Sequence, residues 1–90
     1  MNFRFQCTET FWKKFYALSP GQKAAVRTTW AIFKKNPFDP RLGTHRINSL
    51  SARYGKTIHS VVVESDLRVV FYLEDRTVWT VDLGTHAIYR

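Results

Sequence analysis

The sequence predicts an α+β protein in which an N-terminal helical hairpin packs on one face of a twisted antiparallel β-sheet. Two observations predict this fold class. Apolar residues recur at helical spacing in the first part of the chain, up to Lys35. After Thr44, segments rich in β-branched residues alternate with short polar turns, which is typical of antiparallel strands. Helices followed by such a meander give one covered sheet, so all 90 residues are assigned to a single domain, 1–90.

The chain is expected to begin with a short strand, because Phe3-Arg4-Phe5-Gln6-Cys7 alternates apolar and polar residues. Thr8 or Thr10 can then cap a first helix. One side of that helix would be apolar, and it consists of Phe11, Trp12, Phe15 and Leu18.

A second helix is predicted to start at Ser19. Ser19 suits the N-cap, Pro20 suits the first helical position, and Gln22 completes a capping box. The helix should run to about Lys35, because Asn36-Pro37 cannot continue it. The very short connection between the two helices indicates an antiparallel hairpin.

The rest of the chain is predicted to be a loop followed by strands. Asn36–Thr44 contains two prolines and a glycine, so we expect a loop there. The expected strands are His45–Leu50, Thr57–Glu64, Leu67–Leu73 and Val78–Leu83, and the expected turns are Ser51–Lys56, Ser65-Asp66 and Glu74–Thr77.

Strand parity singles out one arginine. In Leu67–Leu73, the odd-numbered positions are all apolar and suit the face that the helices cover. Arg68 then points to the opposite face, which we expect to be open. An arginine in the middle of a sheet contributes little to strand stability, and its charge must stay hydrated or paired. Arg68 is therefore a candidate functional residue.

The charge distribution predicts a polyanionic partner. The net charge is +7, and the segment between Thr10 and Ser60 has a single acid, Asp39. Such one-sided charge attracts nucleic acid through phosphate contacts and counterion release. An ordinary solvated helix face would account for some of these residues but not for the missing acids. The basic residues are Lys13, Lys14, Lys23, Arg27, Lys34, Lys35, Arg41, Arg46, Arg53 and Lys56.

Several classes of protein are disfavoured by motifs that the sequence lacks. A single cysteine, Cys7, allows no internal disulfide, and its apolar neighbours favour a buried structural thiol over a nucleophile. We find no signal peptide and no apolar run long enough for a membrane span, so a soluble cytoplasmic protein without membrane contacts is expected. The histidines are widely separated and no phosphate-binding glycine loop occurs, so no metal and no cofactor are expected.

The remaining basic, aromatic and histidine residues suit RNA cleavage by attack of the 2′-hydroxyl on the adjacent phosphate. That reaction needs a base, an acid and cations around the phosphorane. His86 follows the last predicted strand after Gly84-Thr85, so it should lie at the rim of the sheet. An ordinary surface histidine in a turn is the alternative interpretation.

At this point the sequence resembles the RelE/ParE superfamily of toxins from type II toxin–antitoxin systems. The resemblance covers nearly the whole chain and rests on the order and spacing of four segments. They are Phe33-Lys34-Lys35-Asn36-Pro37, Leu42-Gly43-Thr44-His45-Arg46-Ile47, Leu67-Arg68-Val69-Val70-Phe71-Tyr72 and Val81-Asp82-Leu83-Gly84-Thr85-His86-Ala87-Ile88-Tyr89.

The resemblance implies roles for individual residues. Arg68 matches the arginine that contacts the scissile phosphate in RelE-type toxins, and His86 matches the catalytic histidine of the YafQ-like branch. Tyr89 falls where that branch has a terminal aromatic residue, and Asp66 lies in a segment similar to its Glu-Pro-Asp-Trp. Val62 stands where that branch has another histidine. Arg46, Arg53, Lys56 and His45 are expected to bind RNA.

The resemblance implies a metal-independent endoribonuclease that cleaves mRNA, on the ribosome, and so inhibits translation. Its partner would be a small, acidic, DNA-binding antitoxin, with which it forms a hetero-oligomer. Two alternatives stay open from the sequence. One is a ParE-like inhibitor of DNA gyrase, a group that lacks the catalytic residues, and the other is a catalytically inactive relative that only binds antitoxin.

Overall fold

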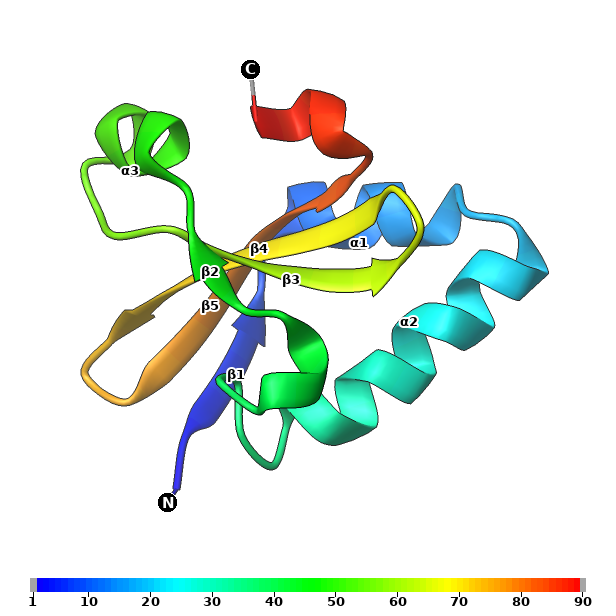
Figure 1. Ribbon diagram of the computed structural model, residues 1–90, viewed down its shortest axis with the longest axis horizontal. Helices are drawn as coiled ribbons and strands as arrows, with labels where there is room; N and C mark the ends of the chain where they lie inside the picture. Colours follow the sequence, from blue (N-terminus) through cyan, green and yellow to red (C-terminus); the bar gives the residue numbers. More distant parts are fainter. Residues whose placement is uncertain (1, 90) are drawn as a thin grey trace.

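The computed structural model describes residues 2–89 and contains helices on both sides of one sheet (Figure 1). No helix within this range is long and apolar enough to cross a membrane. The elements in chain order are β1 (Arg4–Cys7), α1 (Glu9–Tyr16), α2 (Pro20–Phe33), the 3₁₀ helix η1 (Pro40–Leu42), β2 (His45–Arg46), α3 (Asn48–Tyr54), β3 (His59–Glu64), β4 (Leu67–Glu74), β5 (Thr77–Gly84) and the 3₁₀ helix η2 (His86–Tyr89).

The N-terminal helices start at the predicted caps. The Thr8 side chain accepts a hydrogen bond from the Phe11 backbone N–H at 3.2 Å. Ser19 and Gln22 form the complete capping box, with Pro20 in the first turn of α2. The short connection between the helices is confirmed, and α1 and α2 diverge from it (Figure 1).

The sheet has five strands in the order β1-β5-β4-β3-β2, and it is mixed rather than antiparallel. β1 pairs in parallel with β5, with Arg4 opposite Thr77, whereas the other neighbours are antiparallel. The prediction of an all-antiparallel sheet is therefore wrong at this edge. The pairing is parallel because β1 lies beside the last strand of the chain, β5, and no tight turn joins the two strands and sets the direction of β1.

A second correction concerns the segment His45–Leu50, which was predicted to be a strand. Only His45–Arg46 pairs with β3, and Asn48 begins α3. The spacing of Ile47 and Leu50 suits a helix, and both side chains pack on the sheet. The rest of α3 likewise replaces the turn predicted at Ser51–Lys56. Gly55 caps the C-terminus of this helix in the left-handed region, with a φ of +67°.

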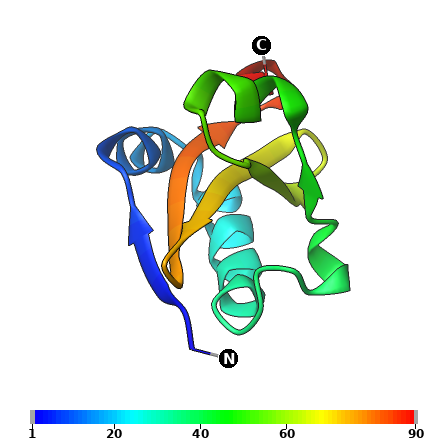
Figure 2. The same ribbon diagram turned by 90° about the vertical axis from the view of Figure 1, so that its left-hand side faces the viewer.

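Three clusters of buried side chains make up the core. The first and second clusters join α1, α2 and η1 to one face of the sheet. The third cluster lies on the other face, beneath α3 and η2 (Figure 2). The clusters are Phe11, Phe15, Val26, Leu67, Val69 and Leu83; then Phe33, Leu42, Val61, Phe71 and Val78; then Leu50, Ile58, Val70 and Val81.

The third cluster corrects the expectation that the second face of the sheet is open. Val70 points to that face, as parity predicts, but Leu50 of α3 covers it. Ile88 and Tyr89 of η2 pack against the same cluster. The helix within Asn48–Tyr54 was not predicted, and this is why the face looked uncovered from the sequence. Arg68 lies on this face near the start of β4, and its side chain is half-buried, so it remains partly accessible.

Candidate active site

The pairing of three strands brings distant segments together at one end of the sheet. Arg68 is the second residue of β4, the central strand. It lies opposite Val62 on β3 and Gly84 on β5. Because η2 starts just after Gly84, His86 comes to the same end of the sheet as Arg68.

The guanidinium of Arg68 is held by the turn that precedes its strand. Its Nη1 atom donates a hydrogen bond to the backbone carbonyl oxygen of Ser65 at 2.9 Å. Ser65 has a φ of +37°, an unusual conformation for a residue with a side chain. The other N–H groups of a guanidinium can still bind an anion in this arrangement.

The same turn also contacts the segment that carries His86. The Oδ1 atom of Asp66 accepts a hydrogen bond from the backbone N–H of His86 at 3.2 Å. Asp66 therefore acts on the first N–H of η2 in the manner of a helix cap. The Ser65-Asp66 turn thus links Arg68 and His86, which are far apart in sequence.

The imidazole of His86 packs against the phenol ring of Tyr89. The two rings meet edge to face, with centroids 4.6 Å apart. The Tyr89 hydroxyl shares a hydrogen bond with the hydroxyl of Ser60 on β3. Ser49 of α3 donates a hydrogen bond to the backbone carbonyl of Tyr89 at 3.0 Å. Both ends of η2 are therefore anchored to other elements.

Gly84 allows η2 to fold back onto the sheet. A β-carbon at this position would lie 2.6 Å from Cγ2 of Ile88, so a larger residue would displace that side chain. Ile88 packs against the third cluster, and the turn closes with a hydrogen bond from the Ile88 N–H to the Thr85 carbonyl at 3.0 Å. The close approach of Ile88 to the strand therefore depends on the absence of a side chain at position 84.

The predicted catalytic residues Arg68, Asp66, His86 and Tyr89 therefore lie together, whereas the predicted RNA-binding residues do not all join them. The Lys56 ammonium pairs with Glu74 and lies 5.1 Å from the centre of the Tyr72 ring. Glu74 ends β4 about 20 Å from Arg68, at the usual rise of a strand. Lys56 thus belongs to the opposite end of the sheet.

The other three predicted RNA-binding residues lie on β2 and α3. His45 is opposite Ser60, and its Nδ1 donates to the Gly43 carbonyl, 2.9 Å away. Arg46 is opposite His59, on the other face of the sheet. Arg53 is exposed in the last turn of α3, one helical turn beyond Ser49. Of these, His45 pairs with the strand residue that bonds to Tyr89, and Arg53 belongs to the helix whose Ser49 contacts Tyr89.

His59 is separated from the candidate site by the sheet itself. Its ring packs between Phe38 and Phe71, with centroid distances of 5.1 and 5.3 Å. Burial and the charge of Arg46 lower the pKa of His59. It therefore does not take the position of the histidine that Val62 replaces.

Acidification should destabilise the protein through His59. Because its pKa in the folded state lies below that in the unfolded chain, the unfolded chain binds the proton first as the pH falls through about 6.5. The free energy of unfolding should decrease from there until the folded pKa is reached. Urea denaturation at about pH 7.5 and about pH 5 should show a smaller decrease for His59→Gln than for the wild type. An equal decrease in both proteins would assign the effect to other groups.

Two further features bear on chemistry. Burial raises the pKa of the Cys7 thiol to about 11, so the thiol stays protonated at neutral pH and is not an activated nucleophile. Within residues 2–89, no group of three or more His, Cys, Asp or Glu side chains is arranged to hold a metal ion.

No known family model matches the sequence, and no curated protein matches it either. Solved structures do resemble it in fold. A chain of the archaeal RelE–RelB complex from Pyrococcus horikoshii has a TM-score of 0.72 at 12% identity, over 94% of this chain and 96% of that one. YafQ from E. coli has a TM-score of 0.71 at 17% identity, over 97% of both chains. The chain has a RelE-like fold.

A third structure agrees with this conclusion. A chain of the E. coli DinJ–YafQ complex has a TM-score of 0.64 at 20% identity, again over 97% of both chains. The RelE-like fold thus spans nearly the full length of this chain and of its structural neighbours. It confirms the α+β class that the sequence motifs imply, but not the fully antiparallel sheet with helices on one face only.

Two residues that form hydrogen bonds with Tyr89 were not predicted from the sequence. Ser60 is fully buried and bonds to Tyr89. A lone hydroxyl residue between His59 and three valines is a usable signal, since a buried hydroxyl in an apolar strand needs a partner. Ser49 carried no such signal, because its segment was predicted to be a strand.

Proposed function

We propose that this protein is the toxin of a type II toxin–antitoxin pair and cleaves mRNA without a metal ion. The observation that carries the proposal is the convergence of Arg68 and His86, which are held by the single turn Ser65-Asp66. An imidazole can transfer a proton in phosphodiester transesterification, and a cation can stabilise the charge of the phosphorane. The RelE-like fold over the whole chain supports the same function.

The proposed reaction is an attack of the RNA 2′-oxygen on the adjacent phosphorus. A base removes the 2′-hydroxyl proton as the new P–O bond forms, and an acid protonates the 5′-oxygen as the old bond breaks. The products are a 2′,3′-cyclic phosphate and a 5′-hydroxyl, so no water is consumed. Arg68 stabilises the charge of the phosphorane, and His86 supplies one of the two proton transfers.

Residues around this centre can bind the RNA. His45 on β2 and Arg53 on α3 are candidates for this, and the net charge of +7 attracts the phosphate backbone. The Tyr89 ring, which is half-buried, packs against His86 and can orient its imidazole. Lys56 and Arg46 lie outside this centre, so their contribution would be long-range attraction to RNA or to the ribosome. We propose mRNA on the ribosome as the substrate, in the cytoplasm.

Expression of the chain in a bacterial host should arrest translation within minutes, and primer extension should reveal new 5′ ends in cellular mRNA. His86→Gln should lower the cleavage rate about 10²- to 10⁴-fold, the usual contribution of a general acid or base. Circular dichroism should show that the variant is folded, because His86 is exposed. DNA-damage signalling with intact mRNA would instead indicate gyrase inhibition, and growth without either response would indicate an inactive relative.

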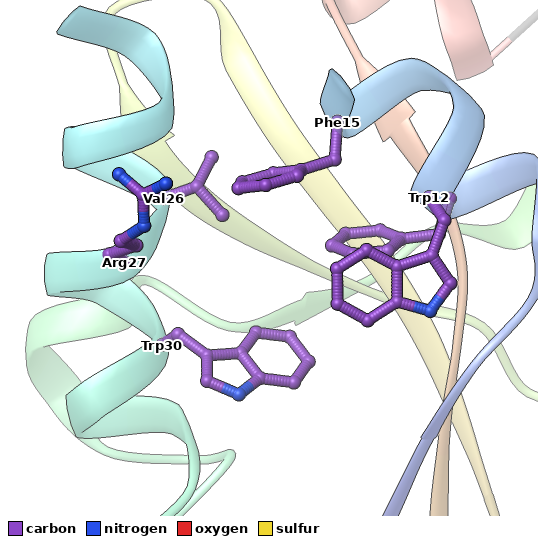
Figure 3. A pocket seen from close by; sticks show the side chains of 6 residues that line it. Trp12, Phe15, Val26, Arg27 and Trp30 are labelled. Carbon is purple, nitrogen blue, oxygen red and sulfur yellow. The ribbon is translucent and has the colours of Figure 1, made fainter. Parts of the chain in front are cut away.

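The proposed partner is a small acidic antitoxin, and the groove between α1 and α2 is the surface we propose for one of its helices. The groove has a volume of about 250 Å³ and is lined mainly by apolar side chains (Figure 3). Trp12 and Phe15 of α1 face Val26 and Trp30 of α2 across it. Trp12 is 43% exposed, which is unusual for so large an apolar side chain.

The charge around this groove specifies the chemistry of its occupant. Arg27 forms one wall, with its guanidinium 5.8 Å from the centre of the Phe15 ring. Each of the two helices that form the groove also carries lysines outside its lining, including the exposed Lys13 of α1 and the half-buried Lys23 of α2. An amphipathic helix with an apolar face and acidic flanks is complementary to this surface. It would fold on binding, as segments of acidic partners often do.

Trp12→Gln should weaken binding of the protein encoded by the neighbouring gene about tenfold or more, because exposed tryptophans in grooves are frequent hot spots. Tyr54→Gln on α3 is a matched control, since Tyr54 is 40% exposed and Trp12 is 43% exposed, and it should bind normally. Isothermal titration calorimetry measures both. Normal binding of Trp12→Gln would place the partner elsewhere on the surface.

A further inference from the structure

The orientation of His86 depends on a very short element. η2 spans only His86–Tyr89, a single 3₁₀ turn. Such a turn is not stable alone, because few internal hydrogen bonds offset the loss of conformational entropy. Contacts with the rest of the protein must therefore determine where the imidazole lies.

The C-terminal end of η2 is anchored through Tyr89. Its hydroxyl shares a hydrogen bond with Ser60, and its backbone carbonyl accepts one from Ser49 at 3.0 Å. The ring lies edge to face against His86, with centroids 4.6 Å apart. Movement of the Tyr89 ring would therefore change the packing of the imidazole.

Ser60 is an unusual anchor because it is fully buried. It is 0% exposed, and its cross-strand neighbours are Val70 of the third cluster and His45 of β2. A hydroxyl in such apolar surroundings is unfavourable unless it has a hydrogen-bond partner. In a medium of low polarity that bond is also stronger and more directional than on the surface.

We propose that Ser60 is a positioning residue of the candidate active site, which fixes the Tyr89 ring and, through it, the imidazole of His86. This inference rests on the proposed function, in which His86 transfers a proton. Ser60 lies on β3 beneath η2 and has no direct contact with the reacting atoms in this scheme. Its removal should slow the chemical step and leave RNA binding unchanged, because no cationic side chain is altered.

The test is a double-mutant cycle on the Ser60–Tyr89 bond. Cleavage of mRNA is measured in a purified translation system at varied concentrations of programmed ribosomes. Ser60→Ala and Tyr89→Phe should each lower kcat about tenfold or more with KM unchanged, and the double variant should lose no more than either alone. Ser60→Thr keeps the hydroxyl and should recover most of the activity; Ser60→Cys is a nearly isosteric alternative if the extra methyl group of threonine prevents folding.

Two outcomes would overturn the proposal. One is an unchanged kcat for a folded Ser60→Ala variant. The other is a double variant whose loss is the product of the single losses, because independent effects multiply.

A second measurement separates this inference from the proposed function. The proton chemical shifts of the His86 imidazole report the ring current of Tyr89, whether or not the protein cleaves RNA. In Ser60→Ala they should move toward those of a freely exposed histidine, and Ser60→Thr should restore them. Unchanged shifts would overturn the positioning role, whereas shifts that move in a protein without nuclease activity would leave that role intact and refute the nuclease.

Discussion

Arg68→Ala should reduce mRNA cleavage by about 10²- to 10³-fold, the usual effect of removing one group that stabilises transition-state charge. The guanidinium lies at the end of the central strand, half-buried, and one of its N–H groups is already committed to the Ser65 carbonyl. The substitution removes the cation that the Ser65-Asp66 turn holds in the proposed centre. Single-turnover cleavage of mRNA on programmed ribosomes measures the effect on the chemical step.

The control for this prediction is Arg68→Lys. A lysine retains the charge but cannot make two parallel hydrogen bonds to a phosphate, so it should recover only part of the activity. Both variants should remain folded, because the Arg68 side chain belongs to none of the core clusters. Full cleavage activity in a folded Arg68→Ala variant would contradict the proposed mechanism.

Phe33→Ala should have the largest effect on stability, with a loss of about 3–5 kcal/mol in the free energy of unfolding. Phe33 is 1% exposed, and its ring contacts Phe5, Trp30 and Phe71 with centroid distances of 5.6, 5.1 and 5.0 Å. The side chain thus joins α2 to two strands. The total stability of a 90-residue protein is only about 5–13 kcal/mol, so much of it would be lost.

Urea denaturation followed by far-ultraviolet circular dichroism measures this loss. Phe33→Leu retains most of the buried volume and should lose clearly less. Tyr16→Ala removes a side chain that is 67% exposed and should change the free energy by less than about 1 kcal/mol. A loss at Phe33 no larger than that at Tyr16 would contradict the assignment of the second cluster to the core.

The residues of the candidate site were predictable to different degrees. Arg68 and His86 could be found from strand parity and from the turn after the last strand, since both are local patterns. Asp66 was predicted from the family resemblance, but its contact with the backbone N–H of His86, 20 residues away, was not. Ser49 and Ser60 escaped prediction, since their partner Tyr89 is 40 and 29 residues away in the chain.

The register of β5 against β4 could not be predicted from local sequence patterns either. Val81 and Leu83 have the same strand parity, yet they belong to clusters on opposite faces. A register shift between β4 and β5, at Val70/Phe71, places Asp82 opposite Val70 and Gly84 opposite Arg68. Without that shift, a different residue would lie beside the arginine.

By itself the sequence determined the helix start at Ser19, the strands of the C-terminal meander and the excess of positive charge, and it limited the first cap to Thr8 or Thr10. Helix caps, apolar periodicity and turn residues act between neighbours in the chain, so they favour these elements before any tertiary contact forms. Only the tertiary structure decided the parallel pairing of β1, the helix within Asn48–Tyr54 and the meeting of the Ser65-Asp66 turn with His86. These features depend on burial of the whole core, and the third cluster favours a helix where the local sequence favoured a strand.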